Sequence, residues 1–177
     1  MKYRITTVVF LASMSLFAVA QDMPSMVPPE ELKKLEWMLG EWTGTMNWTE
    51  PGMEGEMSSS MKVEVEGQFY KTTASNKMGE MTMTEVSYMG WDPKDKKFVS
   101  WTFTNFAPTP RIERGTFEGD KFVSVSDPWE VMGRTIVGRG TMTKTSDTEA
   151  TFVLEFKEGD DWMKVADGKM KKKAKAF

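Results

Sequence analysis

The chain contains no cysteine and no histidine among its 177 residues. Without cysteine it can form no disulfide, so a hydrophobic core has to supply its stability. Without histidine it lacks the usual general base and the commonest metal ligand. Zinc sites of the His/Cys type, Ser-His-Asp triads and histidine-ligated haem are therefore excluded.

Leucine is also scarce, while methionine is abundant. After residue 20 the leucines are Leu32, Leu35, Leu39 and Leu154, whereas the whole chain has 17 methionines. Methionine therefore takes over much of the packing, and its flexible thioether also suits an adaptable apolar pocket. The alternative is a Cu(I) site at Met81 and Met83, which share one strand face. The shortage of leucine favours packing, so we expect no metal site.

Residues 1–20 have the composition of a signal peptide. Lys2 and Arg4 provide a basic start, an apolar run follows from Ile5 to Val19, and residues 18–20 read Ala-Val-Ala. The run of about 15 apolar positions is shorter than the ~20 that a membrane-spanning helix needs. We expect cleavage before Gln21, a periplasmic or extracellular location, and no stable membrane insertion after cleavage.

The rest of the chain is acidic. The signal holds two of the 23 basic residues and none of the 26 acidic ones, so the mature charge is 21 − 26 = −5. Such a charge argues against nucleic acid as a partner. The expected organisation is a signal peptide at 1–20, a linker at 21–28, one domain at 29–170 and a basic tail at 171–177.

Residues 29–39 predict a short helix. Pro29 suits its first turn, Leu32, Leu35 and Leu39 form an apolar face, and Gly40 ends it.

After Gly40 the hydrophobic period changes to two, and turn sequences such as EGDK (118–121) separate the alternating runs. Examples of these runs are 61–66, 99–104 and 152–157. No second helical pattern is long enough for a crossover, which excludes a parallel α/β sheet. We predict an all-β protein, an antiparallel up-and-down lipocalin-like barrel of about ten strands with one short N-terminal helix.

The stretch LGEWTGT (39–45) carries a resemblance to known barrels. A short helix running into Gly-x-Trp resembles the entry of lipocalin-like barrels, in which the tryptophan, here Trp42, closes one barrel end. The glycine, here Gly40, lets the helix pack on the strand. Gly44 extends the motif to that of nitrobindin-type haem barrels, but Met46 replaces their next glycine and the haem-binding histidine is absent. We therefore give Gly40, Trp42 and Gly44 a structural role and expect no cofactor.

Four longer segments are similar, in the same order, to the secreted bacterial proteins of domain-of-unknown-function family 1579. They read PPEELKKLEWMLGEWTGT, YMGWDPKDKKFVSW, GTFEGDKFV and SDPWEVMGR. The resemblance spans roughly residues 28–165. It implies a lipocalin-like fold and brings no assigned activity.

Arginine is confined to one region of the mature chain. Its four arginines are Arg111, Arg114, Arg134 and Arg139. Arg111 and Arg114 are three residues apart, and Arg134 and Arg139 are five residues apart. Residues at odd separations on a strand lie on opposite faces, so one arginine of each pair points into the barrel if both stretches are regular strands. A bulge at one of the glycines 138 or 140 would break this rule.

Neighbouring apolar residues select the inward members. Arg114 shares its parity with Ile112, and Arg134 shares its parity with Ile136, so we expect Arg114 and Arg134 to face inward. A buried arginine needs a partner, which is either a ligand carboxylate or an internal acid such as Glu113.

The sequence favours a protein that binds a small molecule without transforming it. We expect the ligand to be an apolar or fatty-acid-like molecule that lies inside the barrel. The alternative is a filled barrel that acts as an envelope interaction or stress-related module. Asp127, Glu130 and Glu113 suggest two-carboxylate chemistry, but Asp127-Pro128 is an ordinary turn, so we assign no catalytic residue. The ligand-binding candidates are Arg114, Arg134, Met81, Met83 and Trp101.

Overall fold

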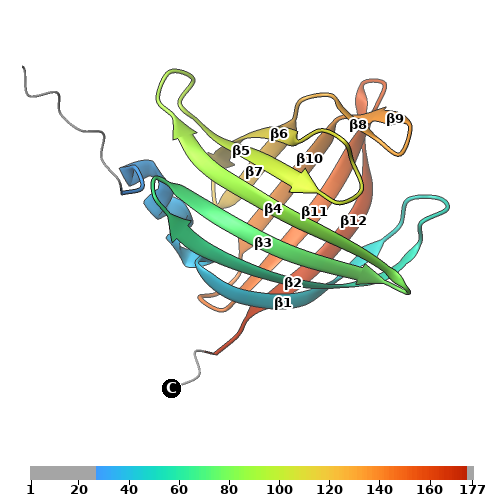
Figure 1. The fold of residues 1–177 in the computed structure, drawn as a ribbon, viewed down its shortest axis with the longest axis horizontal. Coiled ribbons are helices and arrows are strands. Elements are labelled where there is room, and N and C mark those ends of the chain that lie inside the picture. The colour runs from blue at the N-terminus through green and yellow to red at the C-terminus, as the bar shows by residue number, and fades with distance from the viewer. Residues whose placement is uncertain (1–26, 175–177) are drawn as a thin grey trace, which may run out of the picture.

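A computed structural model describes residues 27–174 of the chain. The signal peptide predicted for 1–20, and the linker up to residue 26, lie outside these described residues. Within them, ten strands close into a barrel in the order β1-β12-β11-β10-β7-β6-β5-β4-β3-β2, and all neighbours run antiparallel (Figure 1). The predicted antiparallel barrel of about ten strands with one short N-terminal helix is confirmed.

The strands β8 and β9 form a separate hairpin between β7 and β10. The elements in chain order are η1 (Glu30–Met38), β1 (Gly40–Trp48), β2 (Gly55–Glu66), β3 (Phe69–Met78), β4 (Met81–Asp92), β5 (Lys97–Thr104), β6 (Arg111–Glu118), β7 (Lys121–Ser126), β8 (Trp129–Val131), β9 (Arg134–Ile136), β10 (Gly138–Lys144), β11 (Glu149–Glu158) and β12 (Asp161–Lys172).

The helix η1 is a 3₁₀ helix, and this changes its buried face. Leu32, Leu35 and Met38 are the residues that it buries. A 3₁₀ helix has three residues per turn, so side chains three apart share one face. The predicted face is therefore correct at Leu32 and Leu35, but Met38 takes the last position in place of Leu39.

η1 packs against one end of the barrel, opposite the β8–β9 hairpin (Figure 1). Below it, Phe98 and Phe122 meet edge to face with ring centroids 5.4 Å apart, and Tyr70 joins the same buried cluster. Edge-to-face contact is a favourable arrangement for aromatic rings. The helix and this aromatic cluster close the barrel at this end, which we call the closed end.

Gly44 lies where β1 and β12 approach each other closely. A Cβ atom at Gly44 would lie 2.0 Å from the Lys169 carbonyl oxygen, and one at Gly168 would lie 2.4 Å from the Thr45 carbonyl oxygen. A side chain at either position would push the two strands apart. Gly44 therefore has a direct structural reason to be glycine.

The strand β5 presents its larger apolar residues to solvent. Trp101 and Phe103 are 37% and 52% exposed, whereas Ser100 and Thr102 are buried in the interior. The cause is Phe98, which enters the aromatic cluster of the closed end and so sets the parity of the whole strand. The strand alternates as its sequence predicts. Its polar residues face the interior and Trp101 faces solvent, which is the opposite of what a ligand-binding role for Trp101 requires.

The C-terminal strand extends further than predicted. β12 runs to Lys172, and the Lys173 amide donates to the Glu41 carbonyl oxygen at 2.8 Å. The first residues assigned to a basic tail thus belong to the barrel, because β1 offers them a pairing edge. Among residues 27–174 the structure contains no helix long and apolar enough to cross a membrane.

Candidate functional site

The barrel encloses a cavity of about 580 Å³, whose lining residues extend from η1 to the loops at the other end of the barrel. The mouth is bordered by the β1–β2 loop, the β5–β6 loop and the β8–β9 hairpin, which contribute Met53, Phe106 and Met132. At the closed end, Trp37, Met38 and Trp42 form the floor. Clefts and cavities of ~300–1,000 Å³ are the usual size of small-molecule sites.

The two walls of the cavity differ in chemistry. The wall made by β10, β11, β12 and β1 is largely apolar, and its side chains include Met142, Phe152, Leu154, Phe156, Met170, Met46 and Trp48. The wall from β2 to β7 mixes methionines with polar groups, which include Ser59, Asn76, Ser87, Ser100, Thr102 and Ser124. The cavity therefore suits a molecule with an apolar body and a polar group on one side.

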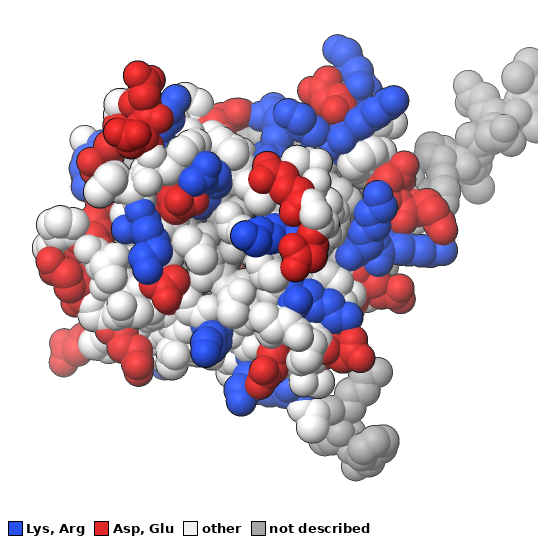
Figure 2. Space-filling model, turned by 180° about the vertical axis from the view of Figure 1, so that it is seen from behind, with Lys and Arg blue, Asp and Glu red and all other residues white. Residues whose placement is uncertain are grey.

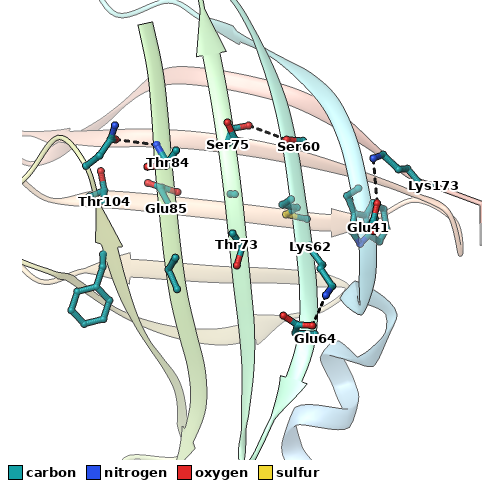
Figure 3. Close-up of a pocket in the computed structure, with 16 residues that line it drawn as sticks. Glu41, Ser60, Lys62, Glu64, Thr73, Ser75, Thr84, Glu85, Thr104 and Lys173 are labelled. Atoms are coloured by element: carbon teal, nitrogen blue, oxygen red, sulfur yellow. Dashed lines mark hydrogen bonds and ion pairs between the residues drawn. The ribbon is translucent and has the colours of Figure 1, made fainter.

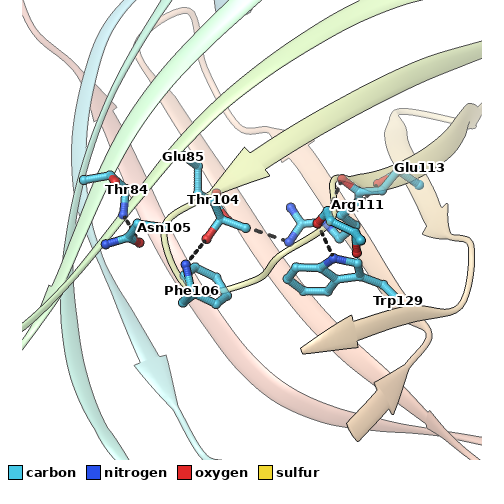
Figure 4. A network of polar contacts seen from close by, with 10 residues as sticks. Thr84, Glu85, Thr104, Asn105, Phe106, Arg111, Glu113 and Trp129 are labelled. Carbon is cyan, nitrogen blue, oxygen red and sulfur yellow. Dashed lines mark hydrogen bonds and ion pairs between the residues drawn. The ribbon is translucent and has the colours of Figure 1, made fainter. Parts of the chain in front are cut away.

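A charged cluster of Glu85, Arg111 and Glu113 lies on the polar wall (Figure 4). Arg111 Nε lies 3.2 Å from a Glu113 carboxylate oxygen, and Arg111 Nη1 lies 3.7 Å from a Glu85 oxygen. The Arg111 guanidinium carbon also lies 5.3 Å from the ring centroid of Trp129. Trp129 is held in turn, because its indole N–H donates to the Thr109 carbonyl oxygen at 2.9 Å. These contacts fix Arg111 from three sides.

The two outer members of this cluster differ in their contacts. Glu113 accepts a further hydrogen bond from the Ser124 hydroxyl at 3.4 Å. Glu85 lies between Ala74 and Thr104 on its neighbouring strands, and within the described residues its one charged partner is Arg111. Ala74, which has a small side chain, lines the cavity next to Glu85.

Burial raises the pKa of the Glu85 carboxyl, and Glu113 adds to this effect while Arg111 opposes it. Burial alone would lower the pKa of the Arg111 guanidinium, but Glu113 and Glu85 together raise it. Arg111 therefore stays charged, whereas the net effect of the surroundings on Glu85 disfavours its charged form.

Glu85→Gln should increase the free energy of unfolding at mildly alkaline pH by about 1 kcal/mol or more, since it removes a poorly paired buried charge. The pKa of Glu85 is raised in the folded state, so its contribution to stability is present below the unfolded pKa and is lost as pH rises through the folded pKa. The variant and the wild type should hence converge near pH 4. Urea unfolding at several pH values measures this, with the outer-face Glu64→Gln as control. A variant less stable than the wild type at alkaline pH would contradict the assignment.

Two buried side-chain nitrogen atoms among the described residues have no hydrogen-bond partner, Arg111 Nε and the indole Nε1 of Trp48. The Trp48 Nε1 atom is buried and donates to no acceptor among the described residues, and Trp48 lines the cavity. Its ring is held edge-on by Phe156, with centroids 6.3 Å apart. A buried donor of this kind is costly unless another molecule supplies an acceptor.

Of the two arginines expected to face inward, Arg114 does not. It lies on the outer face of β6, where its Nη1 makes a 2.6 Å ion pair with Asp127. The inward member of that pair is Arg111, as the odd separation allows. Its parity follows from Gly115 and Phe117, which face the closed-end cluster, whereas Ile112 faces outward beside Trp101.

Arg134 lines the mouth of the cavity rather than its interior. Its guanidinium makes a 2.6 Å ion pair with Glu50 of the β1–β2 loop, and its side chain is 57% exposed. The parity rule does not connect it with Arg139, because β9 ends at Ile136 and β10 begins at Gly138. Arg139 lies outside the barrel, paired with Glu155 at 2.6 Å.

The other predicted ligand-binding residues are divided between the two faces. Met83 is buried and lines the cavity, whereas Met81 begins β4 at the rim and is 38% exposed. Trp101 lies on the outer face, with its ring edge-on to Phe69 at 6.5 Å, so its predicted inward orientation is wrong. Glu85 and Trp48 were missed, although both lie on strands whose alternation was visible in the sequence.

A second, open hollow of about 690 Å³ lies against the outer side of β1 to β5 (Figure 3). Lys62 contacts Glu64 at 2.6 Å and Lys173 contacts Glu41 at 3.2 Å, so these charged groups pair with each other. Exposed pairs of this kind offer a ligand little gain. The remaining charged residue of the hollow, Glu85, also lines the internal cavity and pairs with Arg111. The internal cavity is therefore the stronger candidate site.

Comparison with known proteins supports the fold alone. No protein-family model matches the chain, and no curated protein matches it. Among solved structures, Rv2717c from M. tuberculosis has a TM-score of 0.63 at 11% identity, over 83% of this chain and 99% of that one.

Two further structures are less similar. A protein of unknown function from the DUF3598 family of Nostoc punctiforme has a TM-score of 0.44 at 13% identity, over 87% of this chain and 53% of that one. A redesigned β-barrel has a TM-score of 0.38 at 14% identity, over 78% of this chain and 94% of that one. The resemblance to family 1579 stays a prediction, and the chain shares a closed barrel architecture with Rv2717c.

Proposed function

We propose that the protein binds one small, largely apolar molecule non-covalently inside its barrel. The observation that carries this proposal is the cavity of about 580 Å³, which the side chains of the barrel do not fill. Its apolar wall supplies the hydrophobic contact area, and the methionines give the site adaptable shape. The alternative of a filled barrel that acts only through its surface does not agree with this cavity.

The geometry argues against a fatty acid as the ligand. A fatty acid needs an unpaired cation for its carboxylate, but Arg111 already pairs with Glu113 and Glu85, and Arg134 pairs with Glu50. A carboxylate ligand would have to displace one of these acids. The expected ligand is therefore a largely apolar molecule without a carboxylate.

Filling the cavity should abolish binding. Ala74 faces the cavity on β3, while its neighbour Thr73 is exposed on the outer face of the same strand. Ala74→Trp should reduce the affinity for the neutral fluorescent probe N-phenyl-1-naphthylamine by about tenfold or more, because a bulky side chain takes the ligand's volume. Thr73→Trp is the matched control and should bind as the wild type does. Equal binding by both variants would place the probe outside the barrel and reject the proposal.

We also propose a periplasmic or extracellular location and a lipocalin-like family relationship, both resting on the sequence. Mass spectrometry of exported protein should find Gln21 as its first residue, and an intact Met1 would reject the location. Basic and acidic side chains are interspersed over the face seen in Figure 2, which supports the proposal that nucleic acid is not a partner. We propose no enzymatic activity, cofactor or metal.

A further inference from the structure

The charges that line the cavity do not balance. Its carboxylates are Glu50, Glu85 and Glu113, and its guanidiniums are Arg111 and Arg134, so the count is 2 − 3 = −1. Within the described part of the chain, no lysine lines the cavity to restore neutrality. A negative excess inside a largely apolar enclosure attracts cations and repels anions.

The excess can be assigned to Glu85. Glu50 and Arg134 pair with each other at the mouth at 2.6 Å, and Arg111 lies closer to Glu113 than to Glu85, at 3.2 Å against 3.7 Å. Glu113 has in addition the Ser124 hydroxyl. Glu85 thus has the longest ion pair of these carboxyls, and it lines the cavity beside Ala74.

Buried polar groups normally have a partner, so a carboxyl in the cavity whose one cation lies 3.7 Å away points to a donor supplied by another molecule. Burial raises the pKa of the Glu85 carboxyl, and a cationic partner would offset the cost of its ionisation.

We propose that the cavity selects an amphiphilic amine, whose protonated head group contacts the Glu85 carboxylate while its apolar body lies against the wall of β10, β11, β12 and β1. This inference rests on the proposed binding function and adds the class of the ligand. The ammonium group would bring the charge of the cavity to zero, and an apolar alcohol would only fill its volume.

Isothermal titration with decylamine, 1-decanol and decanoic acid, below their aggregation concentrations and near neutral pH, tests the proposal. The wild type should bind decylamine about tenfold or more tightly than 1-decanol, because a hydrogen bond to a charged group adds this much affinity. Decanoic acid should bind more weakly than 1-decanol. Glu85→Gln should lose the preference for the amine and keep its affinity for 1-decanol.

Glu64→Gln removes the same charge from the outer face and should keep the wild-type order, which separates the effect of Glu85 from that of net charge. If the wild type binds 1-decanol but prefers neither amine nor alcohol, or if Glu85→Gln keeps the preference, the inference fails and the binding function stands. If none of the three compounds binds, both fail. If Glu85→Gln does not fold, the order of the wild-type affinities for decylamine, 1-decanol and decanoic acid tests the inference by itself.

Discussion

Trp42→Ala should lower the free energy of unfolding by ~3–5 kcal/mol. Trp42 is 1% exposed, its ring meets Trp37 edge-on at 5.9 Å, and its indole N–H donates to the Met38 carbonyl oxygen at 2.7 Å. Lys172 Nζ lies 5.3 Å from the same ring centroid. The substitution therefore leaves a void at the floor of the cavity. It also removes the hydrogen-bond donor of the Met38 carbonyl oxygen and the aromatic ring that Lys172 contacts.

Urea unfolding followed by circular dichroism measures this loss. Trp101→Ala is the matched control, because it removes the same side chain from the outer face, where it is 37% exposed. We expect it to cost about 1 kcal/mol and to leave ligand binding unchanged. Equal losses for the two variants would contradict the role of Trp42 as the residue that joins η1 to the barrel.

Arg111→Met should destabilise the protein by about 3 kcal/mol near neutral pH, since it leaves two carboxylates in the cavity without their cation. Among residues 27–174, Arg111 is the one guanidinium within ion-pair distance of both Glu85 and Glu113, and its side chain is 24% exposed. Without it, burial and the nearby Glu113 raise the pKa of the Glu85 carboxyl further. The loss of stability should thus decrease as the pH falls and Glu85 becomes protonated in both the folded and the unfolded state.

Arg114→Met tests whether position matters more than charge. Arg114 lies three residues further along β6, on the outer face, and its pair with Asp127 is exposed. We expect a cost below about 1 kcal/mol, with little dependence on pH. A larger loss for Arg114→Met than for Arg111→Met would show that the inward cluster has been assigned to the wrong residue.

The sequence was sufficient for the fold but not for the orientation of two strands. Alternation, turn residues and the motif around Trp42 predict the barrel and its helix, because each depends on local spacing. Orientation of a strand depends on which of its two faces meets the core. On β5 and β6 the larger apolar residues Trp101 and Ile112 face outward. The assumption that the more hydrophobic face of a strand points into the barrel therefore fails for these two strands.

The candidate site shows the same limit. The odd separation of Arg111 and Arg114 predicts correctly that one of them points inward, and Phe117 on the same strand would have identified which. The cluster itself joins β4 to β6 across β5, and a contact between strands that are not neighbours has no signature in one sequence. The mouth position of Arg134 depends on the β8–β9 hairpin, which leaves the barrel and breaks the parity rule.

The methionines allow the most direct test of binding inside the barrel. Met57, Met83 and Met142 line the cavity, while Met81 and Met163 are exposed outside it, at 38% and 50%. In protein labelled with ¹³C at the methionine methyl groups, titration with 1-decanol should shift the resonances of the cavity methionines and leave those of Met81 and Met163 in place. Shifts confined to Met81 and Met163, or no shifts at all, would contradict an internal binding site.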